Sequence, residues 1–307
     1  MDIQRYESVV DDFLYMQWLR PENIMWDVAA AELISPHLRQ SKKIVDIGVG
    51  NGYTTFLYLG GKFRKEYDWY FNTDVSGFWD NADIYDAKSE FDIQNFVAEP
   101  AQNRLAMCVD HKKNLVDQAR ELDLADKYLV ADANEPIAFE DIDLVFSNMF
   151  YWLRDPASVV RNVFDNLKPG GELVCVCPNT TYYNYCRSYQ RDTKMWTMLN
   201  RGRADSILWS MDTEQFIDEI ADPTGFEVKS ATRYCCEQTL RIWDVGLRPL
   251  SPYLIKMANK LKADDRFEIK QEWCEGIKPI LFELLEEELD SGAKEGGYNF
   301  FHLRKPA

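Results

Sequence analysis

The sequence has no excess of basic residues and no long apolar run. Lysine and arginine number 35 against 51 aspartates and glutamates, which leaves a formal net charge of −16. Because a negative field repels phosphate backbones, we expect no nucleic-acid partner. No stretch approaches the roughly 18 consecutive apolar residues of a membrane span, and the first residues are acidic where a secretory signal is basic and then apolar. We therefore expect a cytoplasmic protein that does not associate with membranes.

Histidine is scarce as well, and no two cysteines have the spacing of a zinc-binding pair. The three histidines, His37, His111 and His302, are scattered along the sequence. The seven cysteines include no C-x2-C pair of the kind that binds zinc. We therefore expect no metal site, and reduced thiols rather than a disulfide framework.

The apolar residues that are present change their spacing along the chain. At 46% hydrophobic and 28% charged residues, the 307-residue chain has enough apolar material for a packed core. Residues 6–39 carry apolar side chains at helical spacing, with a break at Pro21. From residue 43 on, short apolar runs alternate with amphipathic segments, which predicts five parallel strands joined by helices. Two further strands are expected at 225–234 and 297–305.

We expect residues 1–307 to form one domain with a helical cover and two insertions. The cover is residues 1–40, and the insertions are 61–103 and the helical segment 240–296 before the last strand. Long insertions in a compact domain are usually functional or disordered, so both are candidate lids. Three aspartates of the first insertion lack the dense, glycine-containing pattern of a calcium loop, and we interpret them as a solvated acidic loop: Asp80, Asp83 and Asp86.

A glycine-rich turn closes the first expected strand. Residues 46–52 have the sequence Asp-Ile-Gly-Val-Gly-Asn-Gly. Glycine lets a backbone turn tightly and approach a ligand closely. Dinucleotide-dependent oxidoreductases carry G-x-G-x-x-G at this place, but here Gly52 comes one residue sooner and Asp46 stands two residues before Gly48. A carboxylate there suits a ligand with an amino group and a sulfonium better than a pyrophosphate.

With this turn and several later segments, the chain resembles the class I S-adenosylmethionine-dependent methyltransferases. The similar segments are 44–60, 104–178 and 297–306. The resemblance implies a Rossmann-like α/β fold, with a seven-stranded, mostly parallel sheet and helices on both faces. It implies S-adenosylmethionine as cofactor and S-adenosylhomocysteine as product. The cofactor-binding residues that it implies are Asp46, Gly48, Gly50, Gly52, Asp110, His111, Asp132, Ala133, Ser147 and Asn148.

Two aspartates compete for the family's ribose-binding position. In a compact unit this acid falls about 20 residues after the glycines. Asp74 lies 22 residues after Gly52, whereas Asp110 lies 58 residues after it. Asp110 nevertheless ends an expected strand and leads into a regular helix, and the residues after Asp74 have no helical period. We therefore predict that Asp110 binds the ribose.

Aromatic residues beyond the expected strands indicate the acceptor side. Open parallel sheets bind ligands outside the carboxyl ends of their strands. The candidates for acceptor contact are Tyr151, Trp152, Tyr182, Tyr183, Trp243 and Arg248. The arginine could hold a carboxylate or phosphate through two hydrogen bonds. The alternatives are that the aromatic residues only pack in the core and that Arg248 forms a surface ion pair.

The expected reaction is methyl transfer to a small molecule. Such a displacement depends largely on holding a lone pair about 3 to 3.5 Å from the methyl group in a dry site, so no catalytic residue is assigned. A hydroxyl acceptor usually needs a base, most often histidine, and histidine is scarce. We therefore favour an amine nitrogen over a hydroxyl oxygen. Two other hypotheses stay open: a dinucleotide-dependent oxidoreductase, and a noncatalytic partner protein with a methyltransferase fold.

Overall fold

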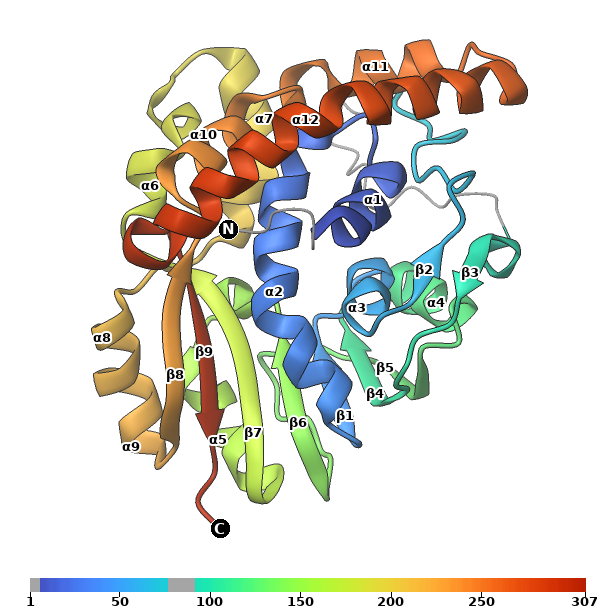
Figure 1. Cartoon of the computed structure of the whole chain (residues 1–307). Coiled ribbons are helices and arrows are strands. Elements are labelled where there is room, and N and C mark those ends of the chain that lie inside the picture. The colour runs from blue at the N-terminus through green and yellow to red at the C-terminus, as the bar shows by residue number, and fades with distance from the viewer. Residues whose placement is uncertain (1–5, 77–91) are drawn as a thin grey trace.

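Seven strands form one sheet, with the first strand of the chain near its centre (Figure 1). A computed structural model describes residues 6–76 and 92–307, so Asp80, Asp83 and Asp86 lie outside the described residues. The order across the sheet is β5-β4-β1-β6-β7-β9-β8. The strands are β1 (Ile44–Ile47), β4 (Leu105–Asp110), β5 (Ala125–Val130), β6 (Ile142–Ser147), β7 (Leu167–Pro178), β8 (Glu227–Tyr234) and β9 (Tyr298–Arg304).

The direction of the strands follows the predicted pattern. The first five in the sheet are parallel, and β9 runs antiparallel to both β7 and β8. Side chains alternate between the two faces, so Val174 and Val176 of β7 enter one core cluster while Cys175 and Cys177 enter the other. The continuous apolar run of β7 is thereby buried on both sides. The predicted fold class is confirmed.

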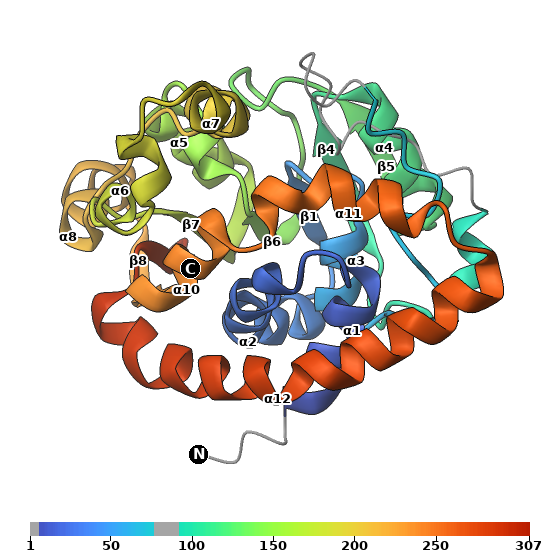
Figure 2. The same cartoon turned by 90° about the horizontal axis from the view of Figure 1, so that it is seen from above.

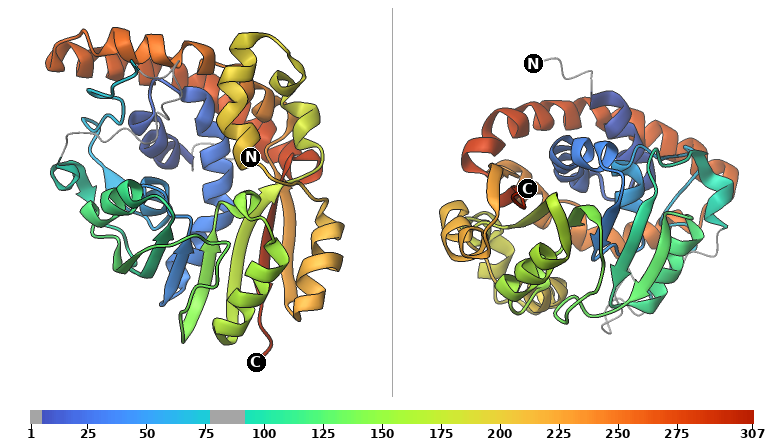
Figure 3. Two further views of the ribbon diagram at one scale, coloured as in Figure 1. Left: turned by 180° about the vertical axis from the view of Figure 1, so that it is seen from behind. Right: turned by 90° about the horizontal axis from the view of Figure 1, so that it is seen from below.

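Helices cover both faces of the sheet, as Figures 1 and 3 show. Helices α2, α3 and α4 contribute to the core on one face, and α5 and α8 to the core on the other. The helices are α1 (Glu7–Met16), α2 (Ile24–Gln40), α3 (Tyr53–Tyr58), α4 (Lys113–Glu121), α5 (Pro156–Asn166), α6 (Tyr182–Tyr185), α7 (Lys194–Ser206), α8 (Thr213–Phe216), α9 (Asp222–Thr224), α10 (Glu237–Val245), α11 (Ser251–Ala258) and α12 (Ala263–Glu295). None of the described helices is long and apolar enough to cross a membrane.

The longest described helix packs against both the N-terminal helices and β8, the strand at one edge of the sheet. Helix α12 has 33 residues, which corresponds to a length of about 50 Å. It contacts α1, α2 and β8, and Figure 2 shows it running along one side of the molecule past α1 and α2. The predicted helical insertion 240–296 therefore corresponds largely to α10, α11 and α12, and its role as a lid stays a prediction.

Helix α12 also holds the first predicted insertion through buried charges. Arg266 Nε lies 2.7 Å from Asp68 Oδ2, with both side chains buried. Lys270, which is 1% exposed, donates to the carbonyl oxygens of Lys65 and Tyr67. A buried charge is costly unless it is paired and hydrogen-bonded, so these contacts fix the 65–68 segment against α12. The two insertions that were predicted separately thus form one contact region, and part of the first is the small sheet of β2 (Lys62–Phe63) and β3 (Val97–Glu99).

Candidate functional site

The glycine turn lies between β1 and α3, and its three glycines have different surroundings. All three have positive φ angles, 84° at Gly48, 59° at Gly50 and 80° at Gly52. A Cβ atom on Gly48 would come within 1.9 Å of Met149, and one on Gly52 within 3.1 Å of Ala119. A Cβ atom on Gly50 would meet nothing within 4 Å. Gly48 and Gly52 are therefore required by packing, whereas Gly50 faces space into which a ligand can come.

The carboxylate of Asp110 is tied to this turn. Asp110 ends β4, which pairs with β1, and the side chain is buried. Its Oδ2 accepts a hydrogen bond from the amide of Gly50 at 2.9 Å, and its Oδ1 accepts one from the amide of Lys112 at 2.9 Å. Asp74 lies outside any strand, where its carboxylate accepts from the amide of Ser76 at 2.8 Å. Of the two aspartates, the structure brings Asp110 to the glycine turn.

Asp46 is a second carboxylate at the same edge of the sheet. It is 1% exposed and accepts a hydrogen bond from Thr55 Oγ1 at 2.7 Å. Burial raises the pKa of Asp46 to about 7, and the nearby charge of Asp110 acts in the same direction. No basic side chain is paired with Asp46 in the described part of the chain. A cation that entered here would find an uncompensated carboxylate.

The other residues predicted to bind the cofactor lie along the ends of β4, β5 and β6. His111 is exposed, and its ring lies 5.8 Å from that of Trp152. Asp132 accepts from the amide of Asn134 at 2.9 Å. Ser147 Oγ donates to the carbonyl of Ile47 at 2.8 Å and so joins the end of β6 to the end of β1. Ala133, which follows β5, is buried, and Asn148, which follows β6, is partly buried.

Aromatic rings gather at the other half of this sheet edge. Tyr298 at the start of β9 pairs with Pro178 at the end of β7 and with Tyr234 at the end of β8. The ring of Trp26 on α2 lies 4.4 Å from that of Tyr298 and 4.7 Å from that of Trp243. Trp26 and Trp243 are both partly exposed. We call these three residues, Trp26, Trp243 and Tyr298, the aromatic cluster.

The predicted acceptor tyrosines have unequal positions. Tyr182 is 0% exposed and packs in T-shaped contact with Tyr298, so it supports the aromatic cluster from behind. Tyr183 is 37% exposed. Tyr151 is partly exposed, and its ring lies 6.4 Å from that of Tyr298. Tyr182 is thus the buried member of the predicted aromatic set. Tyr151, Tyr183 and Trp243 keep exposed surface, and so does Trp152, which is 37% exposed and lies beside His111.

Arg248 is neither a free clamp nor part of a surface ion pair. Its guanidinium is 7% exposed and donates to Asp244 Oδ1 at 3.3 Å and to Asn200 Oδ1 at 2.8 Å. Asp244, itself buried, also accepts from the amide of Ser188 at 2.8 Å and pairs with Arg203. Both alternatives predicted for Arg248 assumed an exposed side chain. The structure corrects that assumption, since Arg248 is buried between α7 and α10. Its guanidinium already donates to groups within the chain.

The sequence prediction of no metal site rested on the cysteine spacing and on the scatter of the histidines along the chain, but two of these histidines are neighbours in space. The rings of His37 on α2 and His302 on β9 lie 4.2 Å apart. They meet because α2 packs on the face of the sheet to which the side chain of His302 points. Among the three histidines, only His111 stands beside the glycine-turn edge.

One carboxylate of this region was missed by the sequence prediction. Asp27 on α2 accepts from Gln17 Nε2 at 2.8 Å, and burial raises its pKa to about 7. The charges of Asp27 and Asp46 both raise the pKa of the buried Tyr58, so both carboxylates are close enough to influence the same phenol. Asp27 was passed over because a lone aspartate in a helical pattern looks like a solvated residue.

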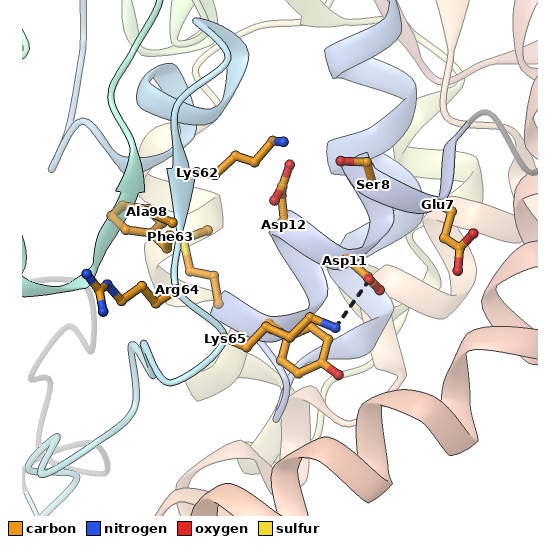
Figure 4. Close-up of a pocket in the computed structure, with 11 residues that line it drawn as sticks. Glu7, Ser8, Asp11, Asp12, Lys62, Phe63, Arg64, Lys65 and Ala98 are labelled. Carbon is orange, nitrogen blue, oxygen red and sulfur yellow. Dashed lines mark ion pairs between the residues drawn. The ribbon is translucent and has the colours of Figure 1, made fainter.

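A cavity of about 530 Å³ lies apart from the glycine turn, between α1 and the β2–β3 strands (Figure 4). Asp11, Asp12, Lys62 and Lys65 are among its lining residues, and Lys65 pairs with Asp11. Burial raises the pKa of Asp12 to about 7. Asp12 is thus a carboxylate with a raised pKa outside the candidate site.

A comparison with known protein families matches residues 28–231 to the methyltransferase domain. The chain belongs to this family. The match runs from α2 to β8 and includes the glycine turn and the Asp110 segment. It confirms the resemblance found in the sequence.

Solved structures with a similar fold are distant in sequence. The plantazolicin methyltransferase BamL, in complex with a triazolic desmethylPZN analog and SAH, is 11% identical with a TM-score of 0.49, over 98% of this chain and 91% of that one. The phosphoethanolamine N-methyltransferase 2 of Haemonchus contortus, in complex with S-adenosyl-L-methionine, is 17% identical with a TM-score of 0.44, over 91% and 52%. The [4+2]-cyclase SpnF is 14% identical with a TM-score of 0.44, over 91% and 82%. No curated protein sequence matches the chain.

Proposed function

We propose that this chain transfers a methyl group from S-adenosylmethionine to an amine nitrogen of a small molecule. The observation that carries the proposal is the composition of one sheet edge. Asp46, Gly50 and Asp110 stand at its β1–β4 half, and the aromatic cluster stands at its β7–β9 half. Asp27 on α2 directly follows Trp26 of the aromatic cluster in the chain. A cofactor and an acceptor held at these two halves would be neighbours.

The residues at the β1–β4 half suit the cofactor. Gly50 leaves room for a ligand to approach the backbone. Each oxygen of the Asp110 carboxylate accepts one amide and keeps a lone pair for a ribose hydroxyl. The buried carboxylate of Asp46 would hold the ammonium group of the ligand. When bound, S-adenosylmethionine supplies an electrophilic methyl group on a sulfonium.

The residues at the acceptor half suit a cationic amine. Ring faces attract ammonium groups. Trp26 is the ring of the cluster left for this, because Tyr298 is 3% exposed and the guanidinium of Arg203 already lies 3.3 Å from the centre of Trp243. Asp27 would orient the substrate ammonium. A base with a pKa near 7 is well matched to removing a proton at neutral pH, and the pKa of Asp27 is raised to about 7. Loss of that proton gives the nitrogen the lone pair that the transfer requires.

We predict that Asp27→Asn lowers kcat/KM for an amine acceptor by about 100-fold, the lower end of what a positioned base contributes. The dissociation constant for S-adenosylmethionine should change less than about twofold, because Asp27 is assigned to the acceptor. Methyl transfer from labelled cofactor to a panel of amines and their matched alcohols measures the effect, with Asp12→Asn as the control variant. Transfer to alcohols but not amines would refute the amine acceptor, and equal loss in both variants would refute the role of Asp27.

We also predict that cofactor affinity rises with pH up to about 7. The pKa of Asp46 is raised from its ordinary value of 3.8 to about 7, so the free protein carries a proton there at lower pH. The ligand ammonium favours the ionised carboxylate, and binding therefore releases this proton. The dissociation constant should fall by up to about tenfold per pH unit between about 5.5 and 7 and then level off.

Calorimetry in two buffers of different ionisation enthalpy counts the protons released on binding. At pH 6 the count should be close to one in the unmodified chain and close to zero in Asp46→Asn. Asp12→Asn should keep the count of the unmodified chain, since the raised pKa of Asp12 belongs to the separate cavity. A count that is unchanged in Asp46→Asn would contradict the assignment of Asp46 to the ligand ammonium.

The rival functions are distinguished by the ligand. Tight binding of NADH without S-adenosylmethionine would support a dinucleotide-dependent oxidoreductase, and binding of neither would support a noncatalytic partner protein. The family match and the open Gly50 position favour the methyltransferase. A cytoplasmic location and the absence of a nucleic-acid partner stay predictions from the sequence.

A further inference from the structure

Two histidines and a glutamate from three separate elements meet at one place in the fold. His37 comes from α2, Glu172 from β7 and His302 from β9, and one possible ligand atom of each lies within 4.8 Å of the others. Glu172 and His302 point to the face of the sheet that α2 covers, because they lie two residues along their strands from Val174 and Phe300, which pack in the core on that face. The three side chains converge although their elements are far apart in sequence.

The geometry of this cluster fits a metal ion better than a simple ion pair. Nε2 of His302 lies 3.0 Å from Oε2 of Glu172, yet Nε2 makes no aligned hydrogen bond with any described residue. In a tetrahedral zinc site with bonds of about 2.0 to 2.1 Å, neighbouring ligand atoms are about 3.3 Å apart. An ion pair between Glu172 and His302 would not use the second imidazole, His37, whose ring packs beside His302 and Phe300.

We propose that His37, Glu172 and His302 bind one divalent transition-metal ion. Two imidazoles with one carboxylate suit zinc and related ions rather than calcium or magnesium, which prefer oxygen ligands. The side chains of His302 and Glu172 are 15% and 29% exposed, so the cluster lies near the surface of the protein. The site is independent of the proposed methyl transfer.

The position of the cluster indicates a structural role. Glu172 pairs with Leu144 near the start of β6. The cluster therefore lies toward the end of the sheet opposite the glycine turn, where the parallel strands begin. Figure 1 shows α2 running down in front of the sheet toward this end, where β1 begins. A bound ion would therefore fasten the end of α2 to β7 and β9. It would stabilise the folded chain, because the unfolded chain cannot bring the three ligands together.

Calorimetric titration with zinc chloride tests the proposal on the full chain, purified without a histidine tag and stripped with a chelator. We expect one zinc ion per chain, a rise in the melting temperature with zinc, and no rise with calcium. His37→Gln and His302→Gln should each weaken zinc binding by more than about 100-fold, since even the outer partners of metal ligands contribute about 10- to 100-fold. His111→Gln is the matched control, because it removes the remaining histidine and should leave zinc binding unchanged.

Measurements on the variants distinguish a specific zinc site from weak binding at the surface. Circular dichroism and melting of each variant in chelator show whether it folds, so lost binding in a folded variant supports the site. Visible absorption of the cobalt-substituted chain gives a second measurement, and the strong bands of four-coordinate cobalt should disappear in His37→Gln. Absence of zinc binding in the unmodified chain, or equal binding in His37→Gln and His111→Gln, would overturn the proposal whatever the fate of the methyltransferase assignment.

Discussion

Asp110→Ala is expected to weaken the binding of S-adenosylmethionine by at least about 3 kcal/mol, more than 100-fold in the dissociation constant. Two hydrogen bonds from ribose hydroxyls to the carboxylate would be lost, and bonds to a charged group contribute about 1.5 to 3 kcal/mol each. The substitution also frees the amides of Gly50 and Lys112, which the carboxylate holds at 2.9 Å. Isothermal titration with S-adenosylmethionine and S-adenosylhomocysteine measures the loss for both ligands.

Asp74→Ala is the control, since sequence spacing alone would have chosen this aspartate. Its carboxylate accepts an amide within its own turn, so the dissociation constant should change less than about twofold. Asp110→Asn keeps one oxygen for an amide of the turn and should give a smaller loss than Asp110→Ala. Damage from Asp74→Ala with none from Asp110→Ala would show that the ribose acid has been assigned to the wrong position.

The parallel part of the sheet could be predicted because each of its strands is buried on both faces. A short continuous apolar run such as the one in β1 is typical of a strand covered by helices on both sides, and the amphipathic segments between such runs fix the parallel order. The same pattern identified Asp110 despite its distance from the glycines. The insertion adds residues between β1 and β4 without changing the register in which Asp46 pairs with Cys108.

The residues that were misjudged depend on contacts between distant elements. Arg248 was predicted to be exposed, but α7 supplies Asn200 and Arg203 around the same buried carboxylate, Asp244. His37 and His302 are far apart in sequence and adjacent in space. Asp27 has no local signal at all, because its burial arises from the packing of α1 and α2. Local periodicity predicts which face of an element is apolar, but it does not predict which polar residues two elements bring together.

Gly50→Asn is expected to abolish measurable cofactor binding while leaving the chain folded. Asparagine tolerates positive φ better than most residues, so the φ of 59° at this position can be kept. Its side chain would then enter the space in which a Cβ atom meets nothing within 4 Å. If the cofactor occupies that space, the new side chain excludes it, and the dissociation constant should rise by more than about 100-fold, or about 2.7 kcal/mol. Titration with S-adenosylhomocysteine measures the rise, and thermal unfolding checks the fold.

Gly170→Asn separates exclusion of the ligand from backbone strain. Gly170 also has a positive φ, 74°, and a Cβ atom there would make an ordinary contact of 3.5 Å with the guanidinium of Arg304. It lies near the start of β7, at the edge of the sheet opposite the glycine turn. The two variants should therefore unfold at similar temperatures, while only Gly50→Asn loses the ligand. Unchanged affinity in Gly50→Asn would mean that the ligand does not fill the space at Gly50, and equal loss in both variants would mean that strain rather than exclusion is responsible.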